Sequence, residues 1–302
     1  MHITIHDVDH GFCALVECPN GARYMIDCGR AKRPGWSPSV HYAGTAIDLL
    51  VIQNLDEDHV EDLSELLRTV TVRSVFSNPT VTASALASMK PDGMRTGVST
   101  AHNVLRDFGP GLIGRWPDTG EVQVVHFYCR FGTHFTETND LSLATFFRWG
   151  NFTILFGGDL ETAGWQMMLR NQEFQRLLVG TQVFVTSHHG RENGKCAELF
   201  QIMRPDIAVI SDDAIQYGTQ EKSTQWYRDR VKGIPVLGTE NAYGIRDKRH
   251  VLTTRRDGTI SIAVGAWGNY LVTPEKVQNE LTLGEILGSF GRNALSKDSQ
   301  VA

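Results

Sequence analysis

The chain has 302 residues, 41% hydrophobic and 21% charged, which is ample material for one large globular domain or two modest ones. A net charge of −5 and a sequence pI near 6.1 exclude a global basic field that would attract nucleic acid or anionic lipid. No apolar run approaches the length that spans a bilayer, and the five cysteines form no CxxC pair, which favours reduced core thiols over a disulfide framework. The N-terminus alternates like a strand and lacks the features of a signal peptide, so we expect a soluble cytoplasmic protein without a membrane partner.

The first 29 residues predict a three-stranded meander, with strands at 3–7, 13–17 and 23–27. The polar turn at 7–11 is able to line a pocket. His2, His6 and His10 recur every four residues, but a strand does not place them on one face, so we assign them no metal role. Residues 31–46 read as a loop.

An apolar run at 47–52 predicts a strand buried on both faces, and apolar residues from Val60 to Val70 then recur at helical spacing. Between them lie Asp56, Asp58 and His59, on the loop that joins strand to helix. Carboxylates crowded together repel one another unless a cation neutralises them, so a divalent metal is one explanation. The alternative is an acidic helix N-terminus, which the helix dipole favours.

The middle of the chain predicts strands at 74–77, 121–129, 142–148 and 152–156, and helices from Pro79 and at 99–108. The last of these strands ends in Gly157-Gly158-Asp159, and one helix is predicted over 162–179. A further buried strand at 182–186 ends in His188-His189-Gly190. Two adjacent imidazoles at a strand end are hard to explain as packing.

The remainder predicts helices at 196–203 and 223–231 and strands at 207–211 and 235–237. Strands at 251–254 and 259–264 are expected to pair as a hairpin across Asp257-Gly258. Apolar residues at 281–287 suggest a docking helix. We therefore predict a domain over 1–273, followed by a C-terminal helix and tail over 274–302.

Three separate strand ends thus offer metal-ligand side chains. A carboxylate and histidines that recur at the carboxyl ends of successive buried strands are the arrangement that a metal site needs. The candidate ligands are Asp56, Asp58, His59, Asp159, His188 and His189.

The sequence also resembles the metallo-β-lactamase superfamily, and within it the soluble hydrolase domain of DNA-uptake channel (competence) proteins and their stand-alone relatives. Residues 7–11, with Asn20-Gly21 and residues 26–29, match the opening "DVGQGD…PNG…IDGG" of that branch. Residues 54–59 stand where the family writes HxHxDH, residues 139–143 resemble its "NDxSL", Gly158-Asp159 its "GD", and residues 188–190 its "HHG". The likeness extends over about residues 1–265.

This resemblance implies a four-layer αββα sandwich with the metal site along one edge. It implies a second-site ligand set of Asp58, His59, bridging Asp159 and one of the two adjacent histidines, of which the family pattern favours His189. Both first-site histidines are replaced, by Asn54 and Asp56. We therefore expect either one ion, or two with Asp56 helping to hold a harder one; Zn²⁺ and Mn²⁺ are the candidates, with Mg²⁺ as a further option.

The reaction that these residues predict is hydrolysis by a metal-activated water. The ligand Asp58 belongs to the predicted catalytic centre, and Asp56 serves as proton acceptor if it is not a ligand. The resemblance further implies that Asn54, Asn139, Asp140 and Ser142 orient substrate or ligands, and that the substrate is a phosphodiester in DNA or a nucleotide.

Basic residues gather late in the chain and offer a possible phosphate-binding face, against the usual reading of such residues as solvated surface. Two other functions stay open. One is a degenerate binding or regulatory subunit, and the other is hydrolysis of a lactone or thioester. The sequence identifies no protein partner. The basic residues are Arg228, Arg230, Lys232, Arg246, Lys248, Arg249, Arg255 and Arg256.

Overall fold

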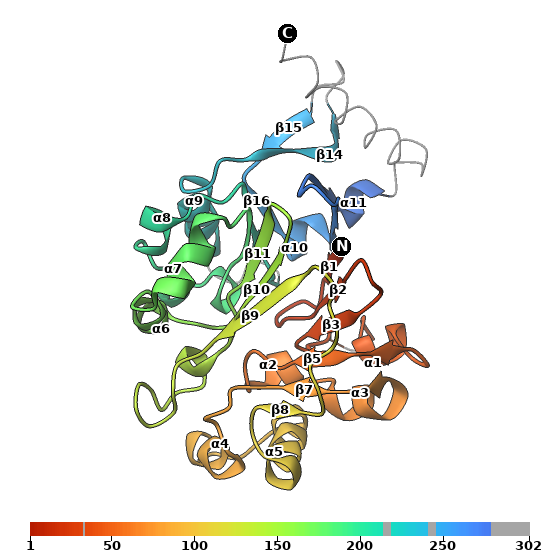
Figure 1. Cartoon of the computed structure of the whole chain (residues 1–302), viewed down its shortest axis with the longest axis vertical. Helices are drawn as coiled ribbons and strands as arrows, with labels where there is room; N and C mark the ends of the chain where they lie inside the picture. The colour runs from red at the N-terminus through yellow and green to blue at the C-terminus, as the bar shows by residue number, and fades with distance from the viewer. Residues whose placement is uncertain (33, 214–218, 241–245, 279–302) are drawn as a thin grey trace.

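The computed structural model describes residues 1–32, 34–213, 219–240 and 246–278, and within them two large sheets lie face to face (Figure 1). The first sheet has eight strands. In spatial order they are β18 (Tyr270–Pro274), β17 (Ile260–Val264), β1 (His2–Ile5), β2 (Ala14–Glu17), β3 (Arg23–Ile26), β5 (Leu49–Val51), β7 (Val75–Phe76) and β8 (Leu112–Ile113).

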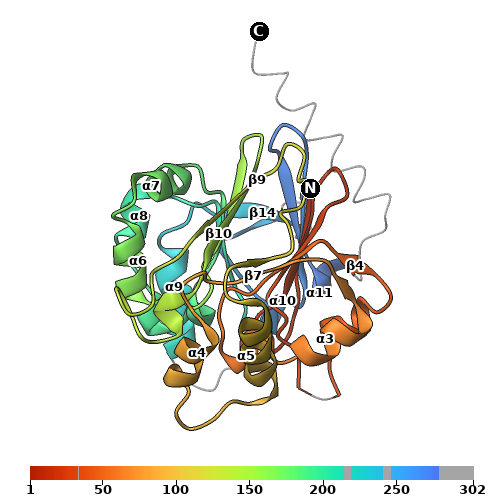
Figure 2. The same cartoon turned by 60° about the horizontal axis from the view of Figure 1, so that its bottom comes forward.

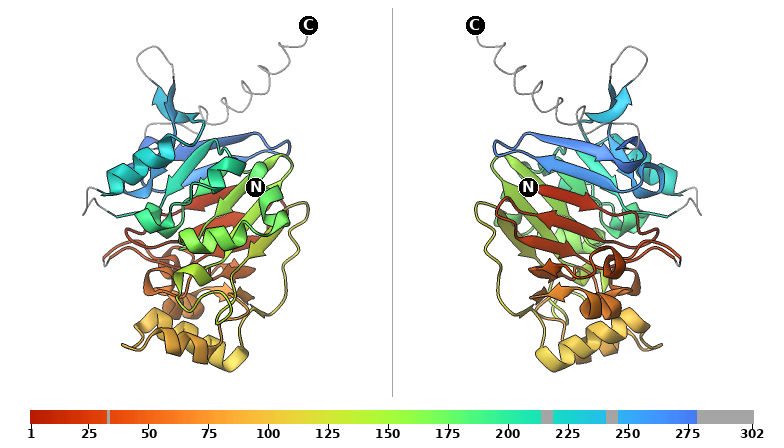
Figure 3. Two further views of the ribbon diagram at one scale, coloured as in Figure 1. Left: turned by 90° about the vertical axis from the view of Figure 1, so that its left-hand side faces the viewer. Right: turned by 90° about the vertical axis from the view of Figure 1, so that its right-hand side faces the viewer.

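The second sheet has six strands among the described residues. In spatial order they are β16 (Val251–Thr253), β13 (Ile207–Ile210), β12 (Val183–Val185), β11 (Phe152–Phe156), β10 (Ala144–Trp149) and β9 (Gln123–Phe127). Two short pairs lie outside the large sheets. They are β4 (Ala46–Ile47) with β6 (Thr71–Val72), and β14 (Ile234–Glu240) with β15 (Arg246–Arg249), the second of which projects at one end of the molecule (Figure 3).

Alternation along the strands builds three separate hydrophobic clusters. In β5, Leu49 and Val51 face the second sheet while Leu50 faces outward, and in β12 Phe184 faces outward between two valines of the inner core. Because successive strand residues point to opposite faces, a strand that is apolar throughout has to be covered on both sides. Each sheet therefore needs helices on its outer face.

Helices supply that cover on both sides (Figure 2). The first sheet is covered by α1 (Pro38–His41), α2 (Glu57–Val60), α3 (Leu63–Thr69), α4 (Ala83–Met89) and α5 (Thr96–Phe108). The second is covered by α6 (Thr162–Met168), α7 (Gln172–Val179), α8 (Leu199–Ile202) and α9 (Thr219–Arg228). The layers follow in the order helix, sheet, sheet, helix, so the predicted four-layer αββα sandwich is confirmed.

The predicted single helix over 162–179 is wrong. It is divided into α6 and α7 because the side chain of Asn171 accepts hydrogen bonds from the backbone N–H groups of Glu173 (2.8 Å) and Phe174 (3.3 Å). An asparagine in this position is an N-cap and starts a new helix.

The predicted hairpin over 251–264 is also wrong. β16 pairs in parallel with β13 in the second sheet, whereas β17 pairs antiparallel with β1 in the first. Between them the chain forms α10 (Thr254–Asp257), where the Asp257 carboxylate accepts from the backbone N–H of Thr253 at 2.9 Å. The Asp-Gly signal marks the end of this short helix, because Gly258 has a φ of 68°.

After β17 the chain adds β18, which the sequence analysis did not predict, and then α11 (Glu275–Gln278). The predicted docking helix at 281–287 lies outside the described residues. The domain boundary at 273/274 stays a prediction. Across the described part of the chain, every helix is too short or too polar to cross a membrane.

Candidate metal centre

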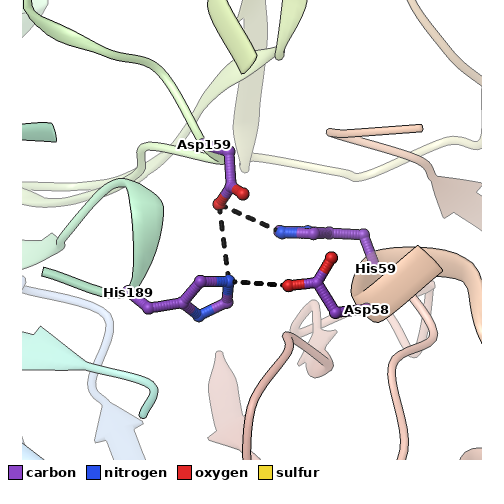
Figure 4. A group of neighbouring side chains, drawn as sticks. All are labelled: Asp58, His59, Asp159 and His189. Carbon is purple, nitrogen blue, oxygen red and sulfur yellow. Dashed lines mark ion pairs between the residues drawn. The ribbon is translucent and has the colours of Figure 1, made fainter. Parts of the chain in front are cut away.

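The candidate centre lies where parallel strands of both sheets end. α2, which follows β5, carries Asp58 and His59, while Asp159 follows β11 and His189 follows β12. Because the carboxyl ends of parallel strands meet at one edge of a sheet, residues more than a hundred positions apart converge there. Figure 4 shows the four side chains turned toward one another, and one potential ligand atom from each lies within 4.8 Å of the others.

Short distances join the facing atoms. Nε2 of His59 lies 3.0 Å from Oδ1 of Asp159, and Nε2 of His189 lies 3.6 Å from the same oxygen. On the other side, Nε2 of His189 lies 3.2 Å from Oδ2 of Asp58. Two carboxylates and two imidazoles therefore form one contiguous group, which is a donor set suited to a divalent transition metal.

Both histidines are fixed through the opposite ring nitrogen. Nδ1 of His59 lies 2.7 Å from Oδ2 of Asp27, and Nδ1 of His189 lies 2.9 Å from the carbonyl oxygen of Ser211. A carbonyl oxygen only accepts, so Nδ1 of His189 donates. In the neutral rings the lone pair is left on Nε2, which faces the group, and such an arrangement is typical of metal-ligating histidines.

Three buried atoms of this group lack a hydrogen-bond partner among the described residues. They are Nε2 of His59, Nε2 of His189 and Oδ1 of Asp159. Buried polar atoms without a partner cost about 1–3 kcal/mol each, so three that face a common point call for something to satisfy them. A cation bound between them would satisfy all three, and the residues present therefore fit a metal ion.

The same neighbours shift the pKa values of the group. Burial alone would lower the pKa of His59, but the carboxylates of Asp159 and Asp27 outweigh it and raise that pKa well above the ordinary value. Burial would raise the pKa of Asp58, yet the imidazoles of His189 and His59 beside it lower that pKa. The pKa of Asp159 is lowered as well, by the same two histidines against its burial, so Asp58 and Asp159 are held ionised, as metal ligands must be.

Left-handed backbone positions surround the group. Asp27, His188 and His189 have φ values of 56°, 49° and 52°, which residues with a side chain rarely adopt. The consecutive pair sends its two imidazoles in different directions, so that only His189 enters the group. Strained backbone that the surrounding fold maintains is common at functional sites.

Two glycines hold the backbone of Asp58 closely. A Cβ atom at Gly11 would lie 2.4 Å from the carbonyl oxygen of Asp58, and one at Gly29 would lie 2.3 Å from it. Any larger residue would displace backbone rather than the end of a flexible side chain. The closeness of these glycines therefore positions Asp58.

Two predicted ligands lie outside the group of four. The carboxylate of Asp56 forms an ion pair with Lys90 and accepts a hydrogen bond from Oγ1 of Thr138 at 2.9 Å. His188 has its Nδ1 3.6 Å from Oε1 of Glu161. Its Nε2 lies 3.3 Å from Nη1 of Arg191, so both ring nitrogens face neighbours other than the four grouped side chains.

The residues predicted to orient substrate form hydrogen bonds around the Asp159 segment. Asn54 donates to Oδ1 of Asn139 (3.3 Å) and Oγ of Ser142 (3.1 Å), and that hydroxyl accepts from the backbone N–H of Asp159 at 3.1 Å. Asp140 accepts from the backbone N–H of Gly164 at 2.9 Å. These contacts position the segment, and a direct contact with substrate stays a prediction.

The sequence analysis missed several residues at this edge. It gave Asp27 and Ser211 no role, although each follows a parallel strand, β3 or β13, as the ligands do. His10 was given no metal role, yet its Nε2 lies 3.4 Å from Oδ2 of Asp58. Arg191, directly after His188-His189-Gly190, contacts His10.

Much of the late basic charge already has partners. Lys232 pairs with Asp206, Arg249 with Asp257, and Arg255 with Asp212, while Arg230 stacks on Trp226 at 3.9 Å. These residues therefore do not form a free cationic face.

Comparison with known proteins adds only remote likenesses. No protein-family model matches the chain, and no curated protein sequence is significantly similar to it. A crystal structure from Parabacteroides distasonis ATCC 8503, provisionally described as a metal-dependent hydrolase, is 10% identical with a TM-score of 0.41, over 83% of this chain and 92% of that one. An E377D mutant of the β-hydroxylase CmlA is 16% identical with a TM-score of 0.40, over 68% of this chain and 45% of that one. Both are too distant to transfer an activity to this chain.

Proposed function

We propose that this chain is a metal-dependent hydrolase, with a divalent ion held by Asp58, His59, Asp159 and His189. The observation that carries the proposal is the convergence of three buried, unpartnered atoms, two of them on imidazole rings whose other nitrogen is held by Asp27 or by the Ser211 carbonyl. The likeness of the sequence motifs to the metallo-β-lactamase superfamily supports the same conclusion.

Three of the four grouped side chains are buried, and the fourth is partly exposed to solvent. The side chains of His59, His189 and Asp159 are at most 5% exposed, whereas that of Asp58 is 25% exposed. Substrate and water therefore approach over Asp58. When bound, a divalent ion supplies a Lewis acid that makes water nucleophilic near neutral pH and stabilises developing negative charge.

The protein's own groups have defined tasks in this scheme. Asp27 and the Ser211 carbonyl hold the two imidazole rings in their tautomers. Oδ2 of Asp58, on the open side, is placed to accept a hydrogen bond from the attacking water. Asp56 is not free to act as a proton acceptor while Lys90 and Thr138 bind it.

For the substrate we propose a phosphodiester, in DNA or a nucleotide. The motif resemblance supports this class over a lactone or thioester. The alternative function, a binding or regulatory subunit, is based on the Asn54 and Asp56 replacements. Four potential ligands that lie together, with Asp58 partly exposed so that water can reach the ion, favour an enzyme instead.

Measurement of metal content tests whether the chain binds a divalent ion at these four residues. Protein purified without chelator is expected to contain stoichiometric Zn²⁺ or Mn²⁺ by elemental analysis. Asp159→Asn removes one carboxylate charge at nearly constant shape and should abolish both metal retention and activity. Asp107→Asn, at an exposed aspartate that pairs with Arg106, is the matched control and should change neither. A wild-type protein that neither retains nor responds to these metals would favour the binding subunit.

A comparison of substrates tests which class of bond the protein hydrolyses. Cleavage of DNA and bis(p-nitrophenyl) phosphate is compared with that of lactones and thioesters, on metal-loaded protein. Faster cleavage of the phosphodiesters that is lost in Asp159→Asn supports the proposal. Turnover of lactones or thioesters alone would assign the site to acyl hydrolysis.

A further inference from the structure

We infer that Arg191 binds an anionic phosphoryl oxygen of the substrate at the open side of the metal centre. The inference rests on the proposed function and extends it, because it names the residue that recognises the charge of the substrate. Arg191 follows the left-handed turn at His188–Gly190, and its backbone N–H closes that turn by donating to the carbonyl oxygen of His188 at 2.8 Å.

The guanidinium lies across two histidine rings. Its Nη1 is 3.3 Å from Nε2 of His188, and its Nη2 is 3.1 Å from Nε2 of His10. A guanidinium has only donors, so both nitrogens accept, and both rings are neutral. Neutral acceptors orient the arginine without cancelling its positive charge.

No carboxylate among the described residues is ion-paired with Arg191. Two neighbouring acidic side chains are already engaged. Glu192, the next residue, pairs with Lys195, and Oε1 of Glu161, which lies 3.6 Å from Nδ1 of His188, accepts from Asn139 (2.9 Å) and Asn193 (2.7 Å). A guanidinium carries five N–H donors, and the two histidines use only two of them. Three donors therefore remain on an exposed cation.

The guanidinium of Arg191 lies beside the exposed side of the metal centre, where an anionic substrate would approach. The His10 nitrogen that contacts Arg191 lies 3.4 Å from Oδ2 of Asp58, the solvent-facing carboxylate of the group. An anion that reaches the centre over Asp58 therefore passes the guanidinium. The forked geometry of arginine matches two oxygens of a phosphate group, whereas a lactone or thioester carbonyl presents one neutral oxygen.

The negative charge of the protein would oppose binding of an anionic substrate. Its net charge is −5, and Asp58 and Asp159 add local negative charge at the centre. A phosphodiester monoanion approaching these carboxylates would be repelled unless a fixed cation offsets them. Arg191 is the arginine that the structure places at this rim.

Two measurements test the inference on the full, metal-loaded chain. Calorimetry with inorganic phosphate measures anion binding, and steady-state kinetics with bis(p-nitrophenyl) phosphate separate KM from kcat. Arg191→Ala should weaken phosphate binding and raise KM by about ten-fold or more, since hydrogen bonds to charged groups are strong. Arg191→Lys keeps the charge but not the fork and should recover part of the loss. Arg176→Ala, at an exposed arginine of α7, is the matched control and should match wild type.

Metal content is measured for every variant, so that failure of the inference and failure of the proposed function are distinguishable. If Arg191→Ala retains metal, phosphate affinity and KM, the inference is overturned while the hydrolase proposal stands. If the wild type binds no metal, the hydrolase proposal fails, and calorimetry with phosphate still decides whether Arg191 binds the anion. A loss of phosphate binding in the alanine variant with unchanged metal content supports the inference.

Discussion

Asp27 and Asp159 contact opposite edges of one imidazole ring. Oδ2 of Asp27 lies 2.7 Å from Nδ1 of His59, and Oδ1 of Asp159 lies 3.0 Å from its Nε2. The other oxygen of Asp27 accepts from the backbone N–H of Gln53 at 2.6 Å, so this carboxylate is itself held in place. Asp27 therefore sets both the tautomer and the orientation of a candidate metal ligand.

The first prediction concerns Asp27→Asn. The amide can still accept from Gln53, but its NH₂ group faces Nδ1 of His59 and favours the tautomer that carries the proton on Nε2. Metal affinity should fall about 10- to 100-fold, as measured by competition with a chromophoric chelator. Asp48→Asn, in a surface pair with Arg73, is the control. Unchanged affinity in a folded Asp27→Asn protein would contradict the role given to this residue.

Sequence reasoning located the four grouped residues because each follows a buried strand, and strand ends of this fold meet at one edge. It missed Asp27 and Ser211, although they obey the same rule, because a lone aspartate or serine after a strand is common and its partner is set by tertiary structure. Local signals also do not say which sheet a strand joins. Asp257-Gly258 therefore suggested a hairpin where the chain crosses from one sheet to the other.

A contact set by tertiary structure also explains why Asp56 lies outside the group of four, although the sequence analysis included it among the candidate ligands. Its position between strand and helix fits a ligand, but Lys90, the residue directly after α4 and more than thirty positions later, neutralises it. The sequence contains no local sign of that contact. Repulsion among neighbouring carboxylates is thus relieved here by a lysine as well as by the proposed ion.

The second prediction is a stoichiometry of one ion per chain. Both oxygens of Asp56 are engaged, by Lys90 and by Thr138, and Asn54 donates to Ser142 and Asn139. Asp56→Asn should therefore leave metal content unchanged and lower the free energy of unfolding by about 1 kcal/mol at most, because the pair is partly exposed.

Elemental analysis measures the metal content, and chemical denaturation measures the free energy of unfolding. Lys90→Met, which removes the other member of the ion pair, is the control. Two ions in the wild type and one in Asp56→Asn would instead identify Asp56 as a ligand.

The third prediction concerns Gly29→Ala. The new Cβ would lie 2.3 Å from the carbonyl oxygen of Asp58 and 2.8 Å from that of Phe12. Backbone atoms cannot rotate away, so the Asp58 segment has to shift, and metal affinity should fall about ten-fold or more, because ligand geometry depends on sub-ångström placement.

Gly180→Ala is the matched control, since its Cβ would meet no atom closer than 3.9 Å. It should retain wild-type metal affinity. Equal affinities for the two variants would show that the close approach at Gly29 does not position Asp58.

The last prediction concerns pH and a histidine away from the metal centre. The ring of His6 is buried, stacks on Trp36 with ring centroids 4.1 Å apart, and has its Nε2 2.7 Å from the hydroxyl of Tyr42. Burial, with a smaller effect of His41, lowers the pKa of His6 to about 3. The unfolded chain binds a proton below about pH 6.5 while the folded chain does not, so stability is fully present above that pH and is lost as pH falls towards 3.

From pH 7.5 to pH 5 this difference amounts to about 2 kcal/mol of unfolding free energy. His6→Gln keeps a polar group near Tyr42 but does not titrate. The stability of the wild type relative to the variant should therefore fall by about 2 kcal/mol over this interval in urea denaturation. His134→Gln, at an exposed histidine of the 131–135 turn, controls for loss of any histidine. Parallel stability curves for wild type and His6→Gln would mean that His6 is protonated in the folded protein as readily as in the unfolded chain.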